Sequence, residues 1–189
     1  ASAAQLLAQS GVEINTIPAA LKSVVDFAQA ANGSLQDAAD TTTSFLGAFK
    51  ETSNITYAAT ANQLTAAVNE SKLTIEDLKS LANFAAQTVA SVGGTSQQLL
   101  GQAARLSNVG IEKSTIATGL RQAYNDLLAR PTVKFLTFLQ TAYAQRGEQK
   151  TKTEISNLLV GFQQRGVRGE GDPLQLVLQE LRSLGVGQR

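Results

Sequence analysis

Apolar residues recur along most of this chain at intervals of three or four positions, which is the spacing of one face of an α-helix. The segment 34–50 shows it well, with a stripe formed by Leu35, Ala38, Ala39, Thr42, Phe45, Leu46 and Phe49. Similar stripes run through segments 53–71, 73–94 and 95–110. The alternation of apolar and polar residues that is typical of β-strands is almost absent. The pattern therefore predicts an all-α fold.

Residues that favour the start of a helix occur between these apolar segments. Thr74 and Thr95 are expected N-caps, because Asp77 and Gln98 follow them at the third helical position. The expected helix starts are spaced roughly every 20 residues, near Ser34, Asn54, Thr74, Thr95 and Ser114. This regular spacing predicts stacked antiparallel helices, that is, helical hairpins. No consensus letters repeat with the period, so ordinary helices joined by short loops are the alternative to a true solenoid.

Beyond Pro131 the sequence changes character. Segment 132–147 is the most aromatic, a charged loop follows it, and Asp172-Pro173 is an N-cap and first-turn pair that opens the last helix. We predict an alanine-rich helical region over residues 1–132 and a C-terminal helical extension over 133–189, with a soft boundary near 147–153. The run of threonines at 41–43 has weak helix propensity, so we expect tertiary packing to hold that segment.

Composition limits which residues can build the core and which kinds of molecule the chain could bind. Among 189 residues, 43% are hydrophobic but only 5% are aromatic, so alanine, leucine and valine must build the core. The net charge is +1 and the basic residues are scattered, which gives no footprint of specific nucleic-acid binding. No apolar run approaches the ~20 residues of a membrane-spanning helix. Methionine is absent even at position 1, so we expect a fragment or a processed product.

The absence of histidine and cysteine removes most catalytic and ligand-binding chemistry. Imidazole bases, thiolate metal sites and serine–histidine or cysteine–histidine nucleophiles are excluded. Paired carboxylates could still hydrolyse glycosides, and the candidates are Glu76, Asp77, Glu112, Asp126, Glu148 and Glu154. Most of them fall in first helical turns, where a negative charge complements the helix dipole. We predict no catalytic residue, no cofactor and no metal, hence a protein that is not an enzyme.

Glycine inside helical patterns indicates surfaces for packing. Gly47, Gly101 and Gly119 each cost about 1 kcal/mol relative to alanine. Gly119 and Ala123 have the small-xxx-small spacing that lets another backbone approach closely. The approaching backbone could belong to another helix of this chain or to a second subunit.

The aromatic segment gives a second candidate surface. Phe135, Phe138 and Tyr143 either pack into a core or form a surface for a partner or for self-association.

Residues 107–132, "SNVGIEKSTIATGLRQAYNDLLARPT", resemble the segment that closes the core region of phage tail tape measure proteins. That family shows an "N-x-G-I" turn, a capped helix "S-x-x-G-T-x-L-R" and an ending "L-x-x-P-T". The residues at matching places are Asn108, Gly110, Ile111, Ser114, Gly119, Leu120, Arg121, Leu128, Pro131 and Thr132. Thr118 and Gly119 stand in reverse order to the commoner Gly-Thr. The resemblance covers about residues 12–132, and residues 133–189 match less well.

The resemblance implies a structural virion protein rather than an enzyme. Tape measure proteins lie inside the tail of long-tailed phages, tube subunits polymerise around them, and their length sets tail length. They leave the tube ahead of the DNA at infection. The implied partners are tail tube and tail tip or baseplate proteins, with self-association and membrane contact left open. The implied location is the virion tail, and the host cytoplasm during assembly. The alternatives are a helical binding or membrane-active module of other origin, or a peptidoglycan hydrolase domain.

Overall fold

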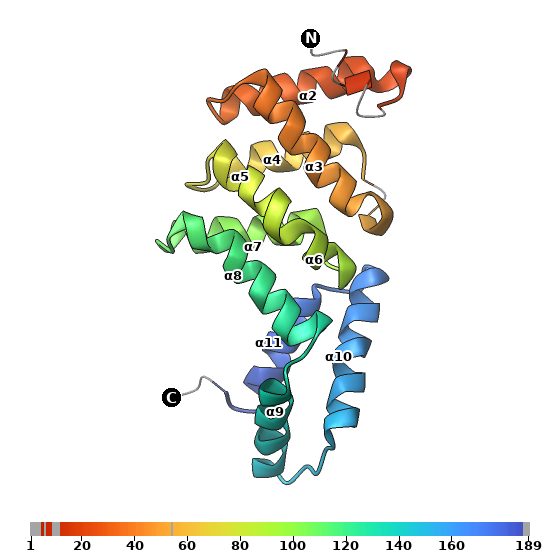
Figure 1. The fold of residues 1–189 in the computed structure, drawn as a ribbon, viewed down its shortest axis with the longest axis vertical. Helices are drawn as coiled ribbons and strands as arrows, with labels where there is room; N and C mark the ends of the chain where they lie inside the picture. The colour runs from red at the N-terminus through yellow and green to blue at the C-terminus, as the bar shows by residue number, and fades with distance from the viewer. Residues whose placement is uncertain (1–4, 6, 9–11, 54, 187–189) are drawn as a thin grey trace.

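The computed structural model describes residues 5, 7–8, 12–53 and 55–186. Every regular element in these residues is helical, which confirms the predicted all-α fold. The helices lie side by side in an elongated stack that ends in three further helices (Figure 1).

Three consecutive hairpins make up the stack in the described residues. The first contains η1 (Ile14–Thr16), α2 (Ile17–Ala30) and α3 (Leu35–Ser53). The second contains α4 (Tyr57–Asn69), then α5 (Ile75–Leu81), the π-helical turn η2 (Ala82–Ala86) and α6 (Gln87–Ser91) as one continuous rod. The third contains α7 (Ser96–Asn108), α8 (Lys113–Tyr124) and the π-helical turn η3 (Asn125–Ala129). We call these hairpins, residues 12–129, the stack.

The helices that follow form what we call the C-terminal arm, residues 133–183. It contains α9 (Val133–Gln145), α10 (Lys152–Val167) and α11 (Pro173–Ser183). The arm lies at the end of the stack away from α2 (Figure 1). Whether residues 1–132 and 133–189 are separate domains stays a prediction.

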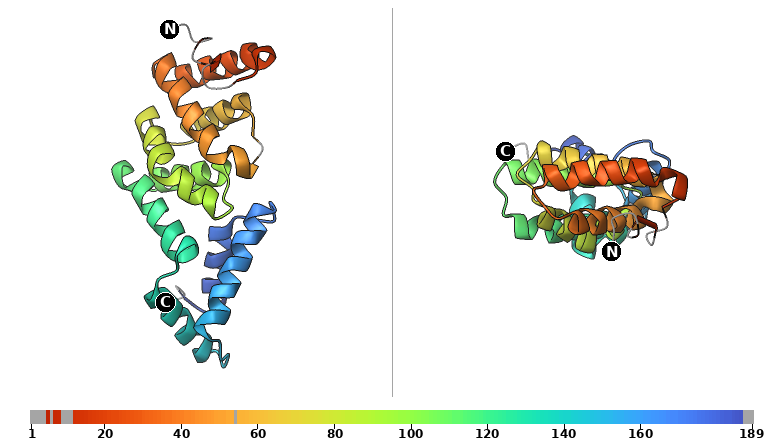
Figure 2. Two further views of the ribbon diagram at one scale, coloured as in Figure 1. Left: turned by 45° about the vertical axis from the view of Figure 1, so that its right-hand side comes forward. Right: turned by 90° about the horizontal axis from the view of Figure 1, so that it is seen from above.

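The stack has two layers, seen edge-on in Figure 2. The first helices of the hairpins, α2, α4 and α7, pack in sequence in one layer, while α3, the α5–α6 rod and α8 pack in the other. The apolar stripes of both layers face inward and form a continuous hydrophobic core. Burial of these stripes between the layers provides the main stabilisation, since short amphipathic helices are marginal alone.

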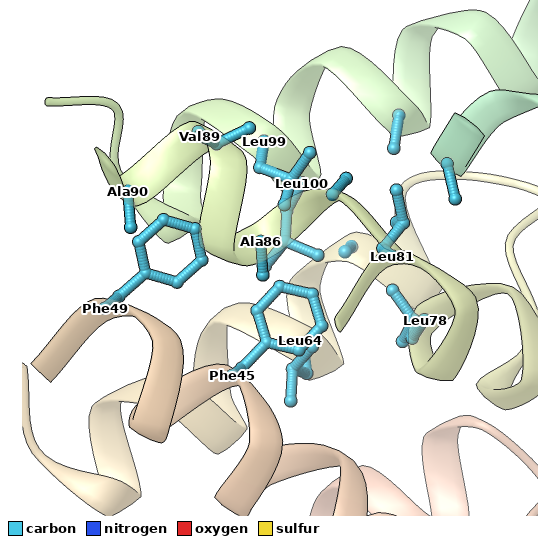
Figure 3. Close-up of a cluster of buried hydrophobic side chains, with 14 of the residues drawn as sticks. Phe45, Phe49, Leu64, Leu78, Leu81, Ala86, Val89, Ala90, Leu99 and Leu100 are labelled. Atoms are coloured by element: carbon cyan, nitrogen blue, oxygen red, sulfur yellow. The ribbon is translucent and has the colours of Figure 1, made fainter. Parts of the chain in front are cut away.

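Phenylalanine from α3 fills the centre of the core. The rings of Phe45 and Phe49 stack with centroids 6.2 Å apart, and both side chains are fully buried. Leu64 of α4 and Leu78 of α5 lie in the same cluster (Figure 3). Most of the cluster is alanine, leucine and valine, as the composition predicts, with a few further aromatic residues such as Phe27 and Tyr124.

The expected caps begin several of the helices. Thr74 with Asp77 and Thr95 with Gln98 form capping boxes at the starts of α5 and α7, as predicted. Asp172 caps α11 through its side chain, with Pro173 in the first turn, also as predicted.

Two expected helix starts are displaced from the predicted residues. Asn54 lies outside the described residues, and Thr56 is the N-cap of α4. Ser114 does not cap α8, because Glu112 occupies the N-cap position and Ser114 Oγ instead donates to Glu112 Oε1 at 2.7 Å. Because α8 begins at Lys113, Ser114 lies inside the first turn and cannot be its N-cap.

The threonine run weakens α3 by a specific mechanism. The hydroxyls of Thr41, Thr42, Thr43 and Ser44 each donate to the backbone carbonyl four residues earlier. Such bonds compete with the helix's own hydrogen bonds and slightly destabilise it. Because Phe45 and Phe49 follow directly and are fully buried, the packing of the hairpins holds α3 in place.

Acidic residues of the helix caps also join successive hairpins. Asp37, which accepts a hydrogen bond from Ser34, forms an ion pair with Lys79 of the second hairpin. Asp77 repeats the arrangement with Lys113 of the third hairpin, at 3.5 Å. In both cases one carboxylate lies at the start of its own helix and also contacts the next hairpin.

We predict that Asp37→Asn lowers stability at neutral pH and makes the chain less sensitive to acid. The ammonium of Lys79 and the hydroxyl of Ser34 hold the pKa of Asp37 below its ordinary value of 3.8. The stabilisation is therefore complete above pH 3.8 and is lost as the pH falls through the lowered pKa. Urea midpoints measured from neutral pH down to strongly acidic pH test this. Asp40→Asn, on an exposed turn of the same helix, is the control; equal effects of both variants would contradict the prediction.

Candidate interaction surfaces

Gly119 lies on the outer surface of α8 and Ala123 is partly buried beside it. A Cβ built on Gly119 would meet no atom within 4 Å. Within the described residues, therefore, no other helix of the chain occupies the space that the small-xxx-small spacing leaves. In this part of the chain, the first of the two partners considered for Gly119 is thus not found. An intermolecular role for the Gly119–Ala123 surface stays a prediction.

Other helical glycines share this exposure. Gly47 in α3, Gly101 in α7 and Gly161 in α10 also have no atom within 4 Å of an added Cβ. Gly93 and Gly166 differ, since an added Cβ would lie 2.5 Å from Val167 N and 2.7 Å from Gly93 O, respectively. Only these two glycines of the five permit close backbone contact within the chain, where the end of α6 meets the end of α10.

The aromatic residues of α9 face in different directions. Tyr143 is buried with Leu139 and Ile155 in a small core of the arm. Its hydroxyl donates to Glu180 of α11, and Lys150 Nζ lies 3.9 Å from its ring centroid. Phe135 is partly buried, whereas Phe138 is 44% exposed. Phe138 is therefore the aromatic residue of α9 that is accessible to another molecule.

A polar cluster joins the arm to the third hairpin. Gln102 Nε2 of α7 donates to the Tyr124 hydroxyl at 2.9 Å and to Asp172 Oδ2 at 2.8 Å. The Tyr124 hydroxyl also donates to Asp172 Oδ1 at 3.4 Å. Burial, followed by the nearby Asp172 carboxylate, raises the pKa of Tyr124 far above its ordinary value. The phenol consequently stays a hydrogen-bond donor at any physiological pH.

Several of the carboxylates considered for catalysis serve helix caps or local hydrogen bonds in this fold. Asp77 and Glu154 complete capping boxes of α5 and α10, and the capping hydrogen bonds of Thr151 lower the pKa of Glu154. Asp126 accepts from Gln122 one turn earlier. Across the described residues, no group of three acidic side chains is placed to hold a metal ion. The absence of enzymatic activity stays a prediction.

Two features of these surfaces were not predicted from the sequence. Phe84 in the π-helical turn η2 is 50% exposed, and Val109 in the turn between α7 and α8 is 76% exposed. The Gln102–Tyr124–Asp172 cluster joins two helices of the third hairpin to a residue 48 positions beyond Tyr124. No spacing rule connects such residues. The one indication of the cluster in the sequence was a glutamine, Gln102, on a helical face that is half-buried.

Comparison with known proteins gives a result that spans nearly the whole chain. The model of a family described as phage-related minor tail protein matches residues 1–185. The chain belongs to this family. No curated protein and no solved structure matches it.

Membership places this minor tail protein in the tail of a phage virion, in contact with other tail components. None of its described helices has the length and hydropathy to span a membrane. Contact of the exposed residues of α8 and α9 with those components stays a prediction.

We predict that Gly119→Ala stabilises the isolated minor tail protein by about 0.5–1 kcal/mol, because alanine favours the helix and the added methyl group meets no atom. Gly93→Ala is the matched opposite. It should destabilise the protein, since Gly93 has φ +81° and lies against the backbone of Val167. Thermal and urea denaturation measure both changes. A loss of stability in Gly119→Ala would show that the α8 surface is already occupied.

We predict that Phe138→Glu leaves the folded structure and its stability nearly unchanged, within about 0.5 kcal/mol. The ring is 44% exposed, so a carboxylate at this position would remain in water. Its neighbour Leu139 is only 2% exposed, and Leu139→Glu should therefore unfold the small core of the arm. Circular dichroism and urea midpoints compare the two variants. Equal destabilisation by both would contradict the exposed placement of Phe138.

Proposed function

We propose that this chain is a segment of a tail tape measure protein, which sets tail length while tube subunits polymerise around it. The proposal is carried by the match to a tail family over residues 1–185 together with the tape measure resemblance of residues 107–132. The family alone gives a phage tail protein. The motif ending at Pro131-Thr132 supplies the more specific role.

The architecture suits a protein whose length determines how far tube subunits polymerise. Each hairpin packs mainly on its neighbours along the chain, so the molecule grows in one direction as hairpins are added. A globular core would instead grow in all directions. Length proportional to residue number is what a molecular ruler requires.

The proposed role needs recognition but no catalytic group. Tail tube and tail tip or baseplate proteins would bind exposed surfaces such as those around Gly119 and Phe138, and copies of the chain could bind one another there. Assembly would take place in the host cytoplasm. During infection the chain would leave the tube before the DNA. Helices with exposed glycines, such as α3 and α8, would favour the rearrangement that this exit demands.

The experiment is a deletion of the second hairpin, residues 55–94, in the phage that encodes the chain, with tail length measured by electron microscopy. If those residues span the tube as a single helix, tails should shorten by roughly 60 Å, at 1.5 Å per residue. If the hairpins remain stacked as in this fold, tails should shorten by about 10 Å, one interhelical distance. The size of the change thus also reports the form of the chain in the tail.

Duplication of the same hairpin should lengthen tails by the same amount, which separates a length effect from a general assembly defect. Leu64→Asp is the control of unchanged length, because it disrupts the buried position at the centre of α4 without altering residue number. Tails whose length is the same in the deletion and duplication phages would rule out the tape measure role. The tail family membership would stand in that case.

A further inference from the structure

We propose that the C-terminal arm is a hinged unit, which turns about residues 130–132 and is held against the stack by a hydrogen-bonded latch of Asp172, Gln102 and Tyr124. This goes beyond the proposed function and does not depend on it. The arm would occupy a closed state, as in this structure, and an open state in which the latch is broken.

The hinge lies where the chain leaves the third hairpin. Helix η3 ends at Ala129 and α9 begins at Val133. Arg130 leaves the helical conformation, with φ −142° and ψ 72°, and precedes Pro131, which disfavours a helical conformation for that residue. A short non-helical link between two helices is the kind of segment that absorbs the backbone rotation of a hinge.

The arm has internal contacts of its own that would keep it together when it turns. Leu139, Tyr143 and Ile155 form a small core within the arm, and Phe135, Leu136, Leu158 and Leu181 pack against both this core and the main one. The Tyr143 hydroxyl also binds Glu180, so that α9, α10 and α11 are joined to one another. Moving the arm as one body would preserve the contacts within it.

The latch is polar and lies beside a groove. Asp172 Oδ2 accepts from Gln102 and Asp172 Oδ1 accepts from Tyr124, while Asp172 also caps α11. A groove of about 530 Å³ runs along this seam, and its lining includes Gln98, Arg105 and Gln175. The seam between α7 and the loop before α11 is therefore incompletely filled, unlike the two-layer core.

The closed state contains an unsatisfied group that the open state would relieve. Gln102 Oε1 is buried and has no hydrogen-bond partner among the described residues. Opening the seam would let water reach this oxygen. Leu159, Phe162, Leu174 and Val177 contribute apolar contacts to the main core and oppose opening. The unsatisfied oxygen favours opening, whereas these buried side chains and the hydrogen bond from Gln163 Nε2 of α10 to Leu128 O of η3 favour the closed state, which is therefore the main one.

The experiment measures the distance between the stack and the arm in the full chain. The protein has no cysteine, so Asn62→Cys in α4 and Gln145→Cys in α9, both exposed, give two specific spin-label sites. Pulsed electron resonance should show one main distance for the otherwise unchanged chain. Tyr124→Phe and Asp172→Ser should each add a second population at a longer distance, raising the open fraction about tenfold, because each removes a hydrogen bond of the latch.

The variants are chosen to separate opening from unfolding. Serine is itself a good N-cap, so Asp172→Ser keeps the start of α11 while its shorter side chain no longer reaches Gln102. Tyr57→Phe is the matched control, because the Tyr57 hydroxyl donates to Ala39 O wholly within the stack. It should leave the distance distribution unchanged. Unchanged distributions in both latch variants, or the same new population in Tyr57→Phe, would overturn the hinge.

Discussion

The burial of narrow apolar stripes between two layers of short helices is the interaction on which this structure depends. No helix of the stack is long or apolar enough to be stable alone, and several contain residues that weaken helices, such as Gly47 and Thr42. Each becomes stable only because the adjacent hairpin covers its stripe. In α3, therefore, local sequence and tertiary packing have opposite effects on helix stability. Hydroxyls that bond to backbone carbonyls weaken the helix, whereas the two fully buried phenylalanines that follow stabilise it.

Polar contacts at the turns add to the packing of the core. The carboxylates of Asp37 and Asp77 lie at the starts of their own helices and are at the same time bound to a lysine of the next hairpin. The same kind of contact thus recurs between successive hairpins, in addition to the interlocking of core side chains of different size, such as Phe45 and its aliphatic neighbours.

The sequence predicted the class of fold and most helix starts because both depend on local patterns. The 3–4 spacing places Phe45 and Phe49 on the buried face, and a threonine followed by Asp77 or Gln98 specifies a helix start. Prediction was weaker where contacts between residues far apart in the chain decide whether a side chain is buried and what it binds. Whether Phe138 is covered depends on where α10 and α11 lie, and the cluster around Asp172 unites residues from α7, α8 and the start of α11. The open space beside Gly119 likewise depends on the fold, because no described helix packs against that face of α8.

Because contacts run mainly between successive hairpins, we expect the stack to respond to a pulling force differently from a globular core. Tension applied to one end should detach one hairpin at a time, while the remaining hairpins stay folded against their own neighbours.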